Sequence, residues 1–315
     1  MKRIVITGSS GYLGRRLVQH YRGQNAVVLG IDIADPGDSK EEQPDEFERI
    51  DISESNFEDR LADFRADALI HSAFVFTPMR NRKKMSRINV EGTRNVLQAV
   101  SRLRIPQLCV VSSATAYGAW PDNPIPLDEA SPIRARPEFQ YSADKGVIEQ
   151  MLCEFQEMIP EVETSWVRPA IIGGPNFDNY LRRFVFGMPF LVKSDGVNSP
   201  MQFVHESDVV SAIATILEKN GTGAFNVGPD DWSTIQEVAE LSGRRAVSWP
   251  FWFTRFIHGF AWMLRLPFHE SPASFLYYSR YPWVVDSKRL KQELGFQFEY
   301  SSHETLQAIL EAEKK

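Results

Sequence analysis

The residues best suited to chemistry in this chain are a tyrosine and a lysine separated by three positions, Tyr141 and Lys145. Because four steps along a helix return to the same face, their side chains should be neighbours in a predicted helix. A free phenol has a pKa of about 10, too high for a general base at neutral pH, but an adjacent ammonium favours the phenolate and lowers that pKa. The pair could therefore exchange a proton with a substrate.

A serine pair ends a hydrophobic strand upstream of that helix. The strand is predicted over Leu108–Ser113, with Ser113 at its carboxyl end and Thr115 just beyond. Doubly wound parallel sheets bind ligands outside the carboxyl ends of their strands, so a hydroxyl here should meet a substrate. A tyrosine and a lysine at this spacing are more often an exposed helix pair. The prediction of a catalytic pair therefore depends on this strand and on a glycine turn near the N-terminus.

The glycine turn joins the first predicted strand to a helix, with glycines at Gly8, Gly11 and Gly14. The first allows a tight turn, the second lets a pyrophosphate approach the backbone, and the third lets helix and strand pack closely. The start of the helix would face the negative charge. The spacing therefore predicts a dinucleotide site, against the alternative of a purely structural turn.

Acidic residues end the next two strands. Asp32 lies at the distance expected for a carboxylate that accepts hydrogen bonds from both ribose hydroxyls and repels a 2′-phosphate, and no arginine follows it closely. NAD is therefore preferred over NADP. Asp51 and Ile52 could contact the adenine, although an aspartate in that place could equally cap a helix.

The elements that must position these residues alternate along the first half of the chain. Short apolar runs alternate with helical patterns, which predicts a parallel sheet covered on both faces. The expected strands are Ile4–Thr7, Val27–Asp32, Phe47–Ile52, Ala68–Ala73, Leu108–Ser113 and Thr164–Pro169, and the expected helices are Tyr12–Tyr21, Phe57–Phe64, Ile88–Leu103 and Tyr141–Met158, with an acidic loop from Asp35 to Glu48. The expected fold class is α/β, a doubly wound parallel sheet (Rossmann) with a smaller C-terminal substrate-binding lobe.

The second half divides between the two parts. The expected NAD-binding domain spans residues 1–172 and receives 201–228, with a helix at Asp208–Lys219 and a strand at Ala224–Val227; residues 173–200 and 229–315 form the substrate lobe. Phe251–Arg265 predicts an amphipathic helix with an aromatic arc and Arg255, His258 and Arg265 opposite. Packing of that arc against the lobe, or a lid, is preferred over a lipid-surface helix.

The pattern as a whole resembles the extended short-chain dehydrogenase/reductase family, the NAD-dependent epimerase/dehydratase group, over nearly the whole chain. The matching stretches are Thr7–Gly14, Asp32, Asp51–Ile52, His71–Ala73, Asn89–Thr93, Ser112–Gly118, Tyr141–Lys145, Arg168–Pro169, Gly174–Pro175, Phe203–His205, Asp208–Val209 and Phe225–Gly228. The resemblance implies that Tyr141 is the acid/base, that Lys145 binds the nicotinamide ribose and tunes Tyr141, and that Ser113 binds the substrate oxygen.

The resemblance also implies a set of binding residues. Those for NAD are Gly8, Ser10, Gly11, Tyr12, Leu13, Gly14, Asp32, Asp51, Ile52, Ala73, Asn89, Tyr141, Lys145 and Pro169, and those for the substrate are Ser113, Thr115, Tyr141 and Ile171. Asn89 would sit in the helix behind Lys145, or simply bend that helix.

The substrate is less defined. Sugar-nucleotide members of the family commonly place an asparagine three residues after the arginine that corresponds to Arg168, and Ile171 stands there instead. This favours a substrate with an apolar body, hydride transfer at a secondary alcohol or ketone carbon, and either a reductase or an epimerase. A nucleotide-sugar epimerase or dehydratase, with Arg182 or Arg183 on the diphosphate, stays open, as do a non-catalytic NAD-binding regulator and a lipid-surface protein.

Composition excludes several classes. With 43% hydrophobic and 24% charged residues the chain should be globular, and a net charge of -6 gives no reason to expect nucleic acid. No metal site is expected, because His71 and His205 lack ligand neighbours. Cys109 and Cys153 are expected to be buried thiols in a reducing compartment. The chain begins with a strand rather than a signal peptide, so a cytoplasmic protein is expected; a homodimer is left open.

Overall fold

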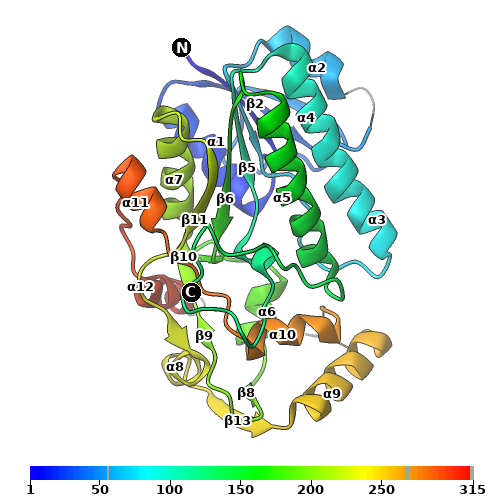
Figure 1. Cartoon of the computed structure of the whole chain (residues 1–315), viewed down its shortest axis with the longest axis vertical. Helices are drawn as coiled ribbons and strands as arrows, with labels where there is room; N and C mark the ends of the chain where they lie inside the picture. Colours follow the sequence, from blue (N-terminus) through cyan, green and yellow to red (C-terminus); the bar gives the residue numbers. More distant parts are fainter. Residues whose placement is uncertain (55–56, 267–269, 313–315) are drawn as a thin grey trace.

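Seven parallel strands form the centre of the molecule, in the order β11-β6-β5-β4-β1-β2-β3 (Figure 1). They are β1 (Arg3–Thr7), β2 (Val27–Asp32), β3 (Glu46–Arg49), β4 (Ala68–His71), β5 (Gln107–Val111), β6 (Glu163–Pro169) and β11 (Gly223–Val227). This computed structural model describes residues 1–54, 57–266 and 270–312. The strand order reverses direction at β1, which confirms the predicted doubly wound fold.

Helices cover both faces of the sheet because successive strand residues point to opposite sides. Ile4 and Ile6 pack with α1 (Tyr12–Gly23) and α7 (Glu206–Glu218) on one face. Val5 and Leu29 pack on the other face, with α2 (Phe57–Phe64), α4 (Gly92–Leu103) and α5 (Gln140–Met158). The near-continuous apolar runs of the sequence are thus buried on both sides.

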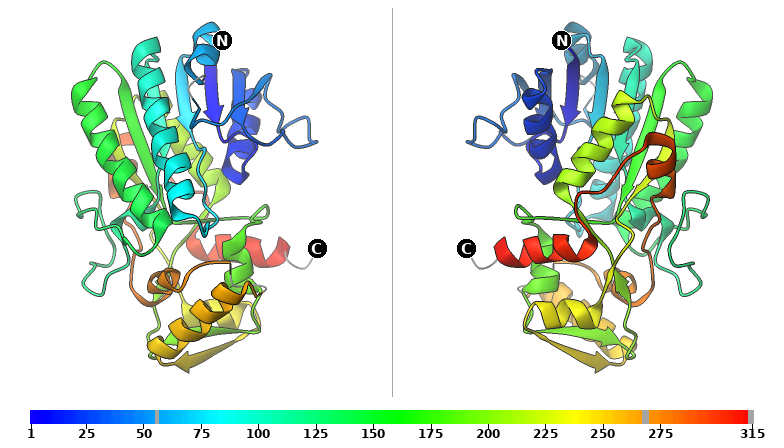
Figure 2. Two further views of the ribbon diagram at one scale, coloured as in Figure 1. Left: turned by 90° about the vertical axis from the view of Figure 1, so that its right-hand side faces the viewer. Right: turned by 90° about the vertical axis from the view of Figure 1, so that its left-hand side faces the viewer.

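A second group of elements lies beyond the carboxyl ends of the strands (Figure 2). Its strands pair two by two: β7 (Ile171–Gly173) with β10 (Phe203–His205), β8 (Phe190–Ser194) with β13 (Arg245–Trp249), and β9 (Pro200–Met201) with β12 (Ser233–Thr234). Its helices are α6 (Tyr180–Phe186), α8 (Ile235–Leu241), α9 (Phe251–Leu264), α10 (Tyr277–Arg280) and α12 (Ser302–Ala312), while α11 (Lys288–Leu294) packs beside α7.

Three local expectations are wrong. The third strand ends at Arg49 rather than Ile52, because the backbone turns at Asp51, whose carbonyl accepts a hydrogen bond from the Glu54 amide. The strand also begins at Glu46, so the loop expected from Asp35 to Glu48 is shorter. The helix expected from Ile88 begins instead as α3 (Arg82–Ser86) and continues through a π-helical turn, Arg87–Glu91. Cys153 is exposed, because α5 buries Leu152 and Phe155 on the opposite side.

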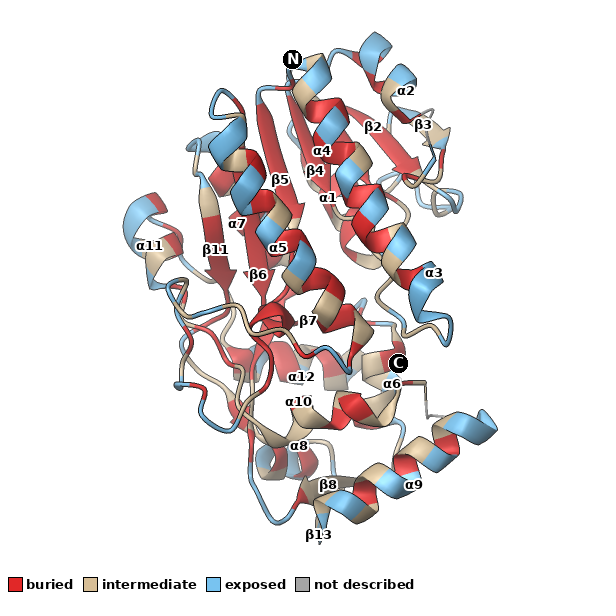
Figure 3. Ribbon diagram, turned by 45° about the vertical axis from the view of Figure 1, so that its right-hand side comes forward, coloured by how far each residue is buried: buried red, intermediate tan, exposed pale blue. Residues whose placement is uncertain are grey.

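The orientation of α9 is also the reverse of the preferred expectation. His258, Thr254 and Ala261 are its buried residues, while most of its aromatic arc faces outward (Figure 3). The polar side is held inside by hydrogen bonds: His258 Nε2 lies 2.8 Å from the Ser271 carbonyl, and Arg255 donates to the Tyr277 hydroxyl. No helix of the described residues is long and apolar enough to cross a bilayer.

Candidate active site

A cleft of about 360 Å³ lies at the carboxyl ends of β1, β4, β5 and β6. It brings together the glycine turn and the three predicted catalytic residues, which are far apart in the sequence. Its lining includes Gly8, Gly11, Tyr12, Leu13, Gly14, Ser113, Thr115, Tyr141, Lys145, Pro169 and Ile171. Since this is the edge where strand order reverses, its position agrees with the general rule for ligand sites in open α/β sheets.

The glycines of the turn have different reasons to be glycine. Gly8 has φ 73°, and a Cβ there would lie 2.6 Å from the Ala73 nitrogen. A Cβ on Gly14 would lie 1.9 Å from the Gly8 carbonyl oxygen, so the fold itself excludes one. A Cβ on Gly11 would meet only that oxygen, at 3.2 Å, and would project toward open space. Gly8 and Gly14 are therefore required for packing, and Gly11 keeps the cleft open.

The beginning of α1 fits a phosphate group. Its N-cap residue is Gly11, and no side chain caps the first turn, so the amides of this turn lack a side-chain partner. Such amides at a helix N-terminus attract an anion. The glycine-lined space beside them is the cradle that a pyrophosphate of NAD would need.

Asp32 is fixed by the backbone on either side of it. One carboxylate oxygen accepts from the Ser10 amide and the other from the Ala34 amide, both at 3.0 Å. Each oxygen has a further lone pair, so the carboxylate can still accept from two hydroxyls. The side chain is half-buried. This ordered geometry fits a ribose diol better than the structural alternative of a solvated aspartate.

Tyr141 is packed among aromatic rings. The ring centroids of Phe74 and Phe76 lie 5.3 and 5.1 Å from its own, both nearly perpendicular to it. Burial raises the pKa of the Tyr141 hydroxyl to about 12, and a hydrogen bond with Ser113 opposes that rise. Ser113 also accepts from the Thr115 hydroxyl at 3.0 Å. Three hydroxyls thus converge at one end of the cleft.

Lys145 is oriented by a carbonyl and a ring. Its Nζ donates to the Val111 carbonyl at 2.7 Å and lies 3.4 Å from the centroid of Phe74, a cation–π contact. Burial lowers its pKa to about 7, against the opposing effect of Glu149 and Asp144. The expectation that Lys145 lowers the pKa of Tyr141 does not hold in this structure, because burial dominates and the amine lies 5.7 Å from the Tyr141 ring centroid.

Asn89 and His71 support the site from behind. The Asn89 side-chain oxygen Oδ1 accepts from the Val75 backbone amide at 2.8 Å, and its side-chain nitrogen Nδ2 donates to the Asp144 carboxylate at 3.0 Å. Asn89 therefore ties the segment that carries Phe74 and Phe76 to α5, next to Lys145, and it does so from the π-helical turn. His71 is buried between Thr7 and Thr93, and its pKa falls to about 3. This is the structural role predicted for it.

Other predicted cofactor residues have structural partners. The Asp51 carboxylate accepts from the Ser53 amide at 2.9 Å. The Ile52 side chain lies in the core against Gly92, and its carbonyl accepts from Asn95. Neither residue is among those that line the cleft, nor are Ser10, Asp32, Ala73 and Asn89, whereas Gly8, Gly11, Tyr12, Leu13 and Gly14 do line it. Ala73 lies under the turn, against Gly8.

A smaller apolar chamber of about 60 Å³ adjoins the cleft at Tyr141. The two share Phe76, Thr115, Tyr141, Ile171, Leu181 and Trp283. The rest of its wall is Phe139, Phe177, Tyr180, Phe184, Val185, Met201, Phe203, Phe275, Tyr278 and Ser279, so no charged side chain lines it among the described residues. Sequence reasoning missed most of these residues. The position of Phe76 shortly after β4 is one available signal, because ligand sites lie at strand ends.

The arginines that sequence or position brings near the cleft are paired with carboxylates of the protein. Arg183 donates to Glu270 at 2.5 and 2.8 Å. Arg182 and Arg183 also lie within 4.0 Å of Asp178. The guanidinium of Arg168 is buried against Glu149 at 2.8 Å and donates to the Tyr117 hydroxyl at 2.6 Å. These contacts hold Arg168 and Arg183 in ion pairs within the protein.

The sequence profile of the NAD dependent epimerase/dehydratase family matches residues 4–228. The chain belongs to this family. It is therefore an enzyme of an NAD-dependent group, with NAD as its cofactor, as the sequence predicts. The match covers the central sheet and the whole of the cleft's polar side.

Individual relatives span most of the chain. Uncharacterized protein Rv0501 of Mycobacterium tuberculosis is 25% identical over 96% of this chain and 82% of its own length. UDP-glucose 4-epimerase of Mycolicibacterium smegmatis is 25% identical over 75% of this chain and 80% of its own. Human short-chain dehydrogenase/reductase family 42E member 1 is 30% identical over 66% of this chain and 56% of its own length.

Solved structures match in fold. UDP-glucose 4-epimerase from Thermotoga maritima, in a complex with UDP-glucose, has a TM-score of 0.78 at 18% identity, over 99% of this chain and 98% of that one. The Thermus thermophilus UDP-glucose 4-epimerase complex with NAD has a TM-score of 0.75 at 21% identity, over 99% of each chain. At these identities the likeness establishes the fold and leaves the substrate open.

Proposed function

We propose that this enzyme transfers a hydride at a secondary alcohol or ketone carbon of a substrate with an apolar body, with Tyr141 as its acid/base. The observation that carries the proposal is the apolar chamber beside Tyr141. Any group bound next to the reacting carbon on that side would meet aromatic and aliphatic side chains. Burial of apolar surface there would supply affinity at roughly 25 cal/mol per Å², while a few hydroxyls orient the reacting oxygen.

The cofactor side of the cleft is assigned to NAD. In this proposal the amides of the glycine turn bind the pyrophosphate, Asp32 accepts from the adenosine ribose, and Lys145 donates to the nicotinamide ribose. Residues 1–172 and 201–228 would form the NAD-binding part, and residues 173–200 and 229–315 the substrate part. When bound, NAD supplies the carbon that takes or gives the hydride.

The proton is assigned to Tyr141. With a pKa of about 12 its phenol is protonated at neutral pH, so it can donate to the oxygen of a ketone as that oxygen gains negative charge. Ser113 would hold the same oxygen, and Thr115 in turn donates to Ser113. The opposite direction needs the phenolate, which burial of the ring disfavours and the hydrogen bond with Ser113 favours.

A nucleotide-sugar substrate is the alternative that relatives with that activity suggest. Two features weigh against it. Ile171 lines both the cleft and the chamber, in the place where an amide would contact the sugar or diphosphate. Arg183 is paired with Glu270, and Asp178 places a carboxylate beside both Arg182 and Arg183 at the rim of the cleft. A diphosphate would have to displace these contacts.

Thermal stabilisation in the presence of NAD tests the substrate class. A ligand that binds the folded protein raises its unfolding temperature. Hydrophobic secondary alcohols and ketones should raise it above the value with NAD alone, and UDP- and dTDP-sugars should not. A large shift with a nucleotide-sugar and none with the apolar set would overturn the proposal and restore sugar epimerisation.

Cofactor selectivity tests the role of Asp32. Wild-type protein should bind NAD at least about tenfold more tightly than NADP, because a carboxylate repels the 2′-phosphate. Asp32→Asn should reduce the preference for NAD, because it weakens NAD binding and strengthens NADP binding. Equal affinities for the two cofactors in the wild type would show that Asp32 does not read the ribose.

A non-catalytic NAD-binding regulator would not need the hydroxyls at the end of the cleft. Product analysis with the stabilising alcohol or ketone separates this alternative from an enzyme. An NAD-bound protein that converts none of the stabilising compounds would favour the regulator. Measurement of NAD that survives dialysis then distinguishes an epimerase, which recycles its cofactor, from a dehydrogenase, which releases it.

A further inference from the structure

The outward face of α9 is an apolar surface made largely of aromatic residues. Trp252 is 71% exposed, Phe256 63% and Met263 59%. The same face carries Ile257, Phe260, Leu264 and, just beyond the helix, Leu266. Isolated exposed apolar residues are ordinary, but a contiguous set along four turns of one helix marks an interaction surface.

Basic residues border the C-terminal end of α9. Arg80 donates to the Trp262 carbonyl, and its guanidinium lies 4.7 Å from the Trp262 ring centroid. Arg80 therefore fixes the segment leading into α3 against α9. Exposed basic side chains follow it, at Arg82, Lys83, Lys84 and Arg87, and Arg265 ends α9 itself. Figure 2 shows α3 and α9 on the same side of the molecule.

This local charge differs from that of the whole chain. The protein carries a net charge of -6, whereas residues 251–269 contain no aspartate or glutamate. Carboxylates beside α9 are paired with arginines: Asp195 accepts from the Phe251 amide at the start of α9 and pairs with Arg280, and Glu270 pairs with Arg183. The α9–α3 face, defined as the exposed residues of α9 and α3 with Arg80, Arg87 and Arg265, therefore combines aromatic side chains with positive charge.

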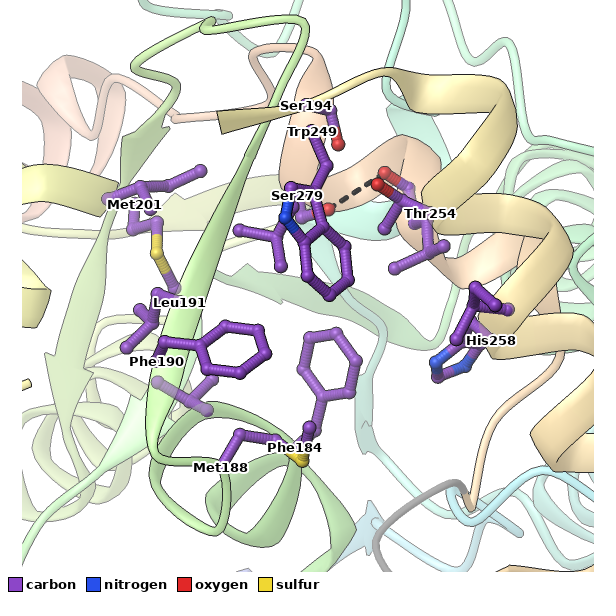
Figure 4. A pocket seen from close by; sticks show the side chains of 15 residues that line it. Phe184, Met188, Phe190, Leu191, Ser194, Met201, Trp249, Thr254, His258 and Ser279 are labelled. Carbon is purple, nitrogen blue, oxygen red and sulfur yellow. Dashed lines mark hydrogen bonds between the residues drawn. The ribbon is translucent and has the colours of Figure 1, made fainter. Parts of the chain in front are cut away.

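An apolar cavity of about 240 Å³ lies behind α9. Thr254, Ile257 and His258 of α9 line one side, and Phe184, Phe190 and Trp249 lie across from them (Figure 4). Four of its residues, Phe184, Val185, Met201 and Ser279, also line the chamber beside Tyr141. Ile257 belongs to both sides of the helix, since it is 39% exposed and lines the cavity. Apolar side chains thus continue from the outer face of α9 to the active site.

We propose that the α9–α3 face docks onto an anionic lipid bilayer. Aromatic side chains insert at the boundary between headgroups and acyl chains, and adjacent basic residues bind anionic headgroups. A second copy of the chain is the weaker occupant, because a symmetric contact would bring a second set of the same basic residues onto the first. Docking is independent of the proposed reaction; if both hold, it places the cavity behind α9 next to a source of apolar substrates.

Vesicle flotation tests the docking with the full chain. Wild-type protein should bind vesicles of phosphatidylcholine mixed with phosphatidylglycerol, bind those of phosphatidylcholine alone at least about tenfold more weakly, and lose affinity as salt is raised. Trp252→Ser/Phe256→Ser and, separately, Lys83→Glu/Lys84→Glu should each weaken binding to the mixed vesicles by at least about tenfold.

Matched variants control for a general change in surface character. Leu241→Ser/Met158→Ser removes two exposed apolar residues on other helices, α8 and α5, and Lys40→Glu/Arg104→Glu reverses two exposed charges elsewhere. Both should bind mixed vesicles as the wild type does. Equal losses in the controls and in the α9–α3 variants would overturn the proposal.

A measurement on the wild type guards against misfolded variants. Lipids brominated near the headgroup should quench part of the tryptophan fluorescence on binding, and Trp252→Phe should remove much of that quenching while the protein still binds. Absence of binding to the mixed vesicles, or binding without quenching, would overturn the docking of α9. A change in oligomeric state with Trp252→Ser/Phe256→Ser, without vesicle binding by the wild type, would assign this face to a second copy.

Discussion

The two sides of the active-site cleft are built from different groups. On the cofactor side the contacts available to a ligand are backbone amides and a fixed carboxylate, at Gly11 and Asp32. On the substrate side they are aromatic and aliphatic surfaces, with Ser113, Thr115 and Tyr141 at the junction. The first side can recognise a charged, hydroxylated molecule by hydrogen bonds, and the second can only exclude water and fit a shape.

This difference determines how each side should tolerate change. Backbone amides recognise a ligand only if the turn keeps its conformation, so a single added methyl group can matter. An apolar wall tolerates substitutions that preserve volume and is sensitive to an unpaired polar group. Tyr141 belongs to both sides, because aromatic packing buries its ring while its hydroxyl meets Ser113.

The largest effect is expected at that junction. Tyr141→Phe should reduce turnover by about 10²- to 10⁴-fold, the range for loss of a general acid/base, while NAD affinity stays within about twofold. Tyr180→Phe is the matched comparison, because Tyr180 is also buried and lines the same chamber. It should lose far less activity. Turnover by Tyr141→Phe similar to that by Tyr180→Phe would remove Tyr141 from its assigned role.

Two glycines of the turn sharpen the comparison on the cofactor side. Gly14→Ala should lower the unfolding temperature as well as NAD affinity, because the new methyl group would lie 1.9 Å from a backbone oxygen. Such overpacking costs about 1–3 kcal/mol, or roughly 2–10 °C. Gly11→Ala should weaken NAD binding by at least about tenfold with a nearly unchanged unfolding temperature, because its methyl group would point into the space that the ligand occupies. Calorimetric titration and thermal unfolding of both variants separate the two effects.

The cofactor side could be predicted closely from the sequence because its determinants are local. Gly8, Gly11 and Gly14 act within one turn, and Asp32 ends the strand that follows. Strand and helix assignments in this half depend on hydrophobic period over short windows. The errors here come from single backbone turns, at Asp51 and at the π-helical turn around Asn89, which the period does not register.

The substrate side could not be predicted in the same way because distant segments build it. Phe76, Phe139, Tyr180 and Phe275 meet in the chamber although nearly two hundred positions separate the first from the last. The sequence predicts the amphipathic helix α9, but an amphipathic pattern alone does not determine which face is turned inward. His258 and Arg255 face inward because Ser271 and Tyr277 satisfy their hydrogen bonds there.

Ile171 offers a test on the apolar side. Ile171→Asn should weaken binding of the most stabilising hydrophobic ketone or alcohol by about tenfold, because a buried amide without a partner costs about 1–3 kcal/mol. Ile171→Val removes one methyl group and should weaken binding of the same ligand by about threefold. Both are read from ligand-dependent shifts in unfolding temperature with NAD present. Tighter binding of a UDP-sugar by Ile171→Asn, without loss of the apolar ligand, would mean that the wall does not select for apolar groups.

The smallest expected effect is a pH dependence of stability that comes from Lys145. Burial lowers its pKa from about 10.5 in the unfolded chain to about 7 in the folded protein. Below pH 7 the lysine is charged in both states and the cost of burying the charge is fully present. Between these two values the folded protein has released the proton that the unfolded chain still holds, so the wild type gains stability as pH rises.

Lys145→Met removes this titrating group, so the difference between the wild type and this variant reports its contribution to stability. The difference in unfolding temperature between wild type and Lys145→Met should therefore move in favour of the wild type between pH 6 and pH 10. A gain of a few kcal/mol corresponds to roughly 2–4 °C for each kcal/mol. Lys40→Met, at an exposed lysine, controls for the loss of one positive charge. A constant difference between the wild type and Lys145→Met would mean that the amine keeps its ordinary pKa, and that the cleft around Tyr141 is more polar than its aromatic lining implies.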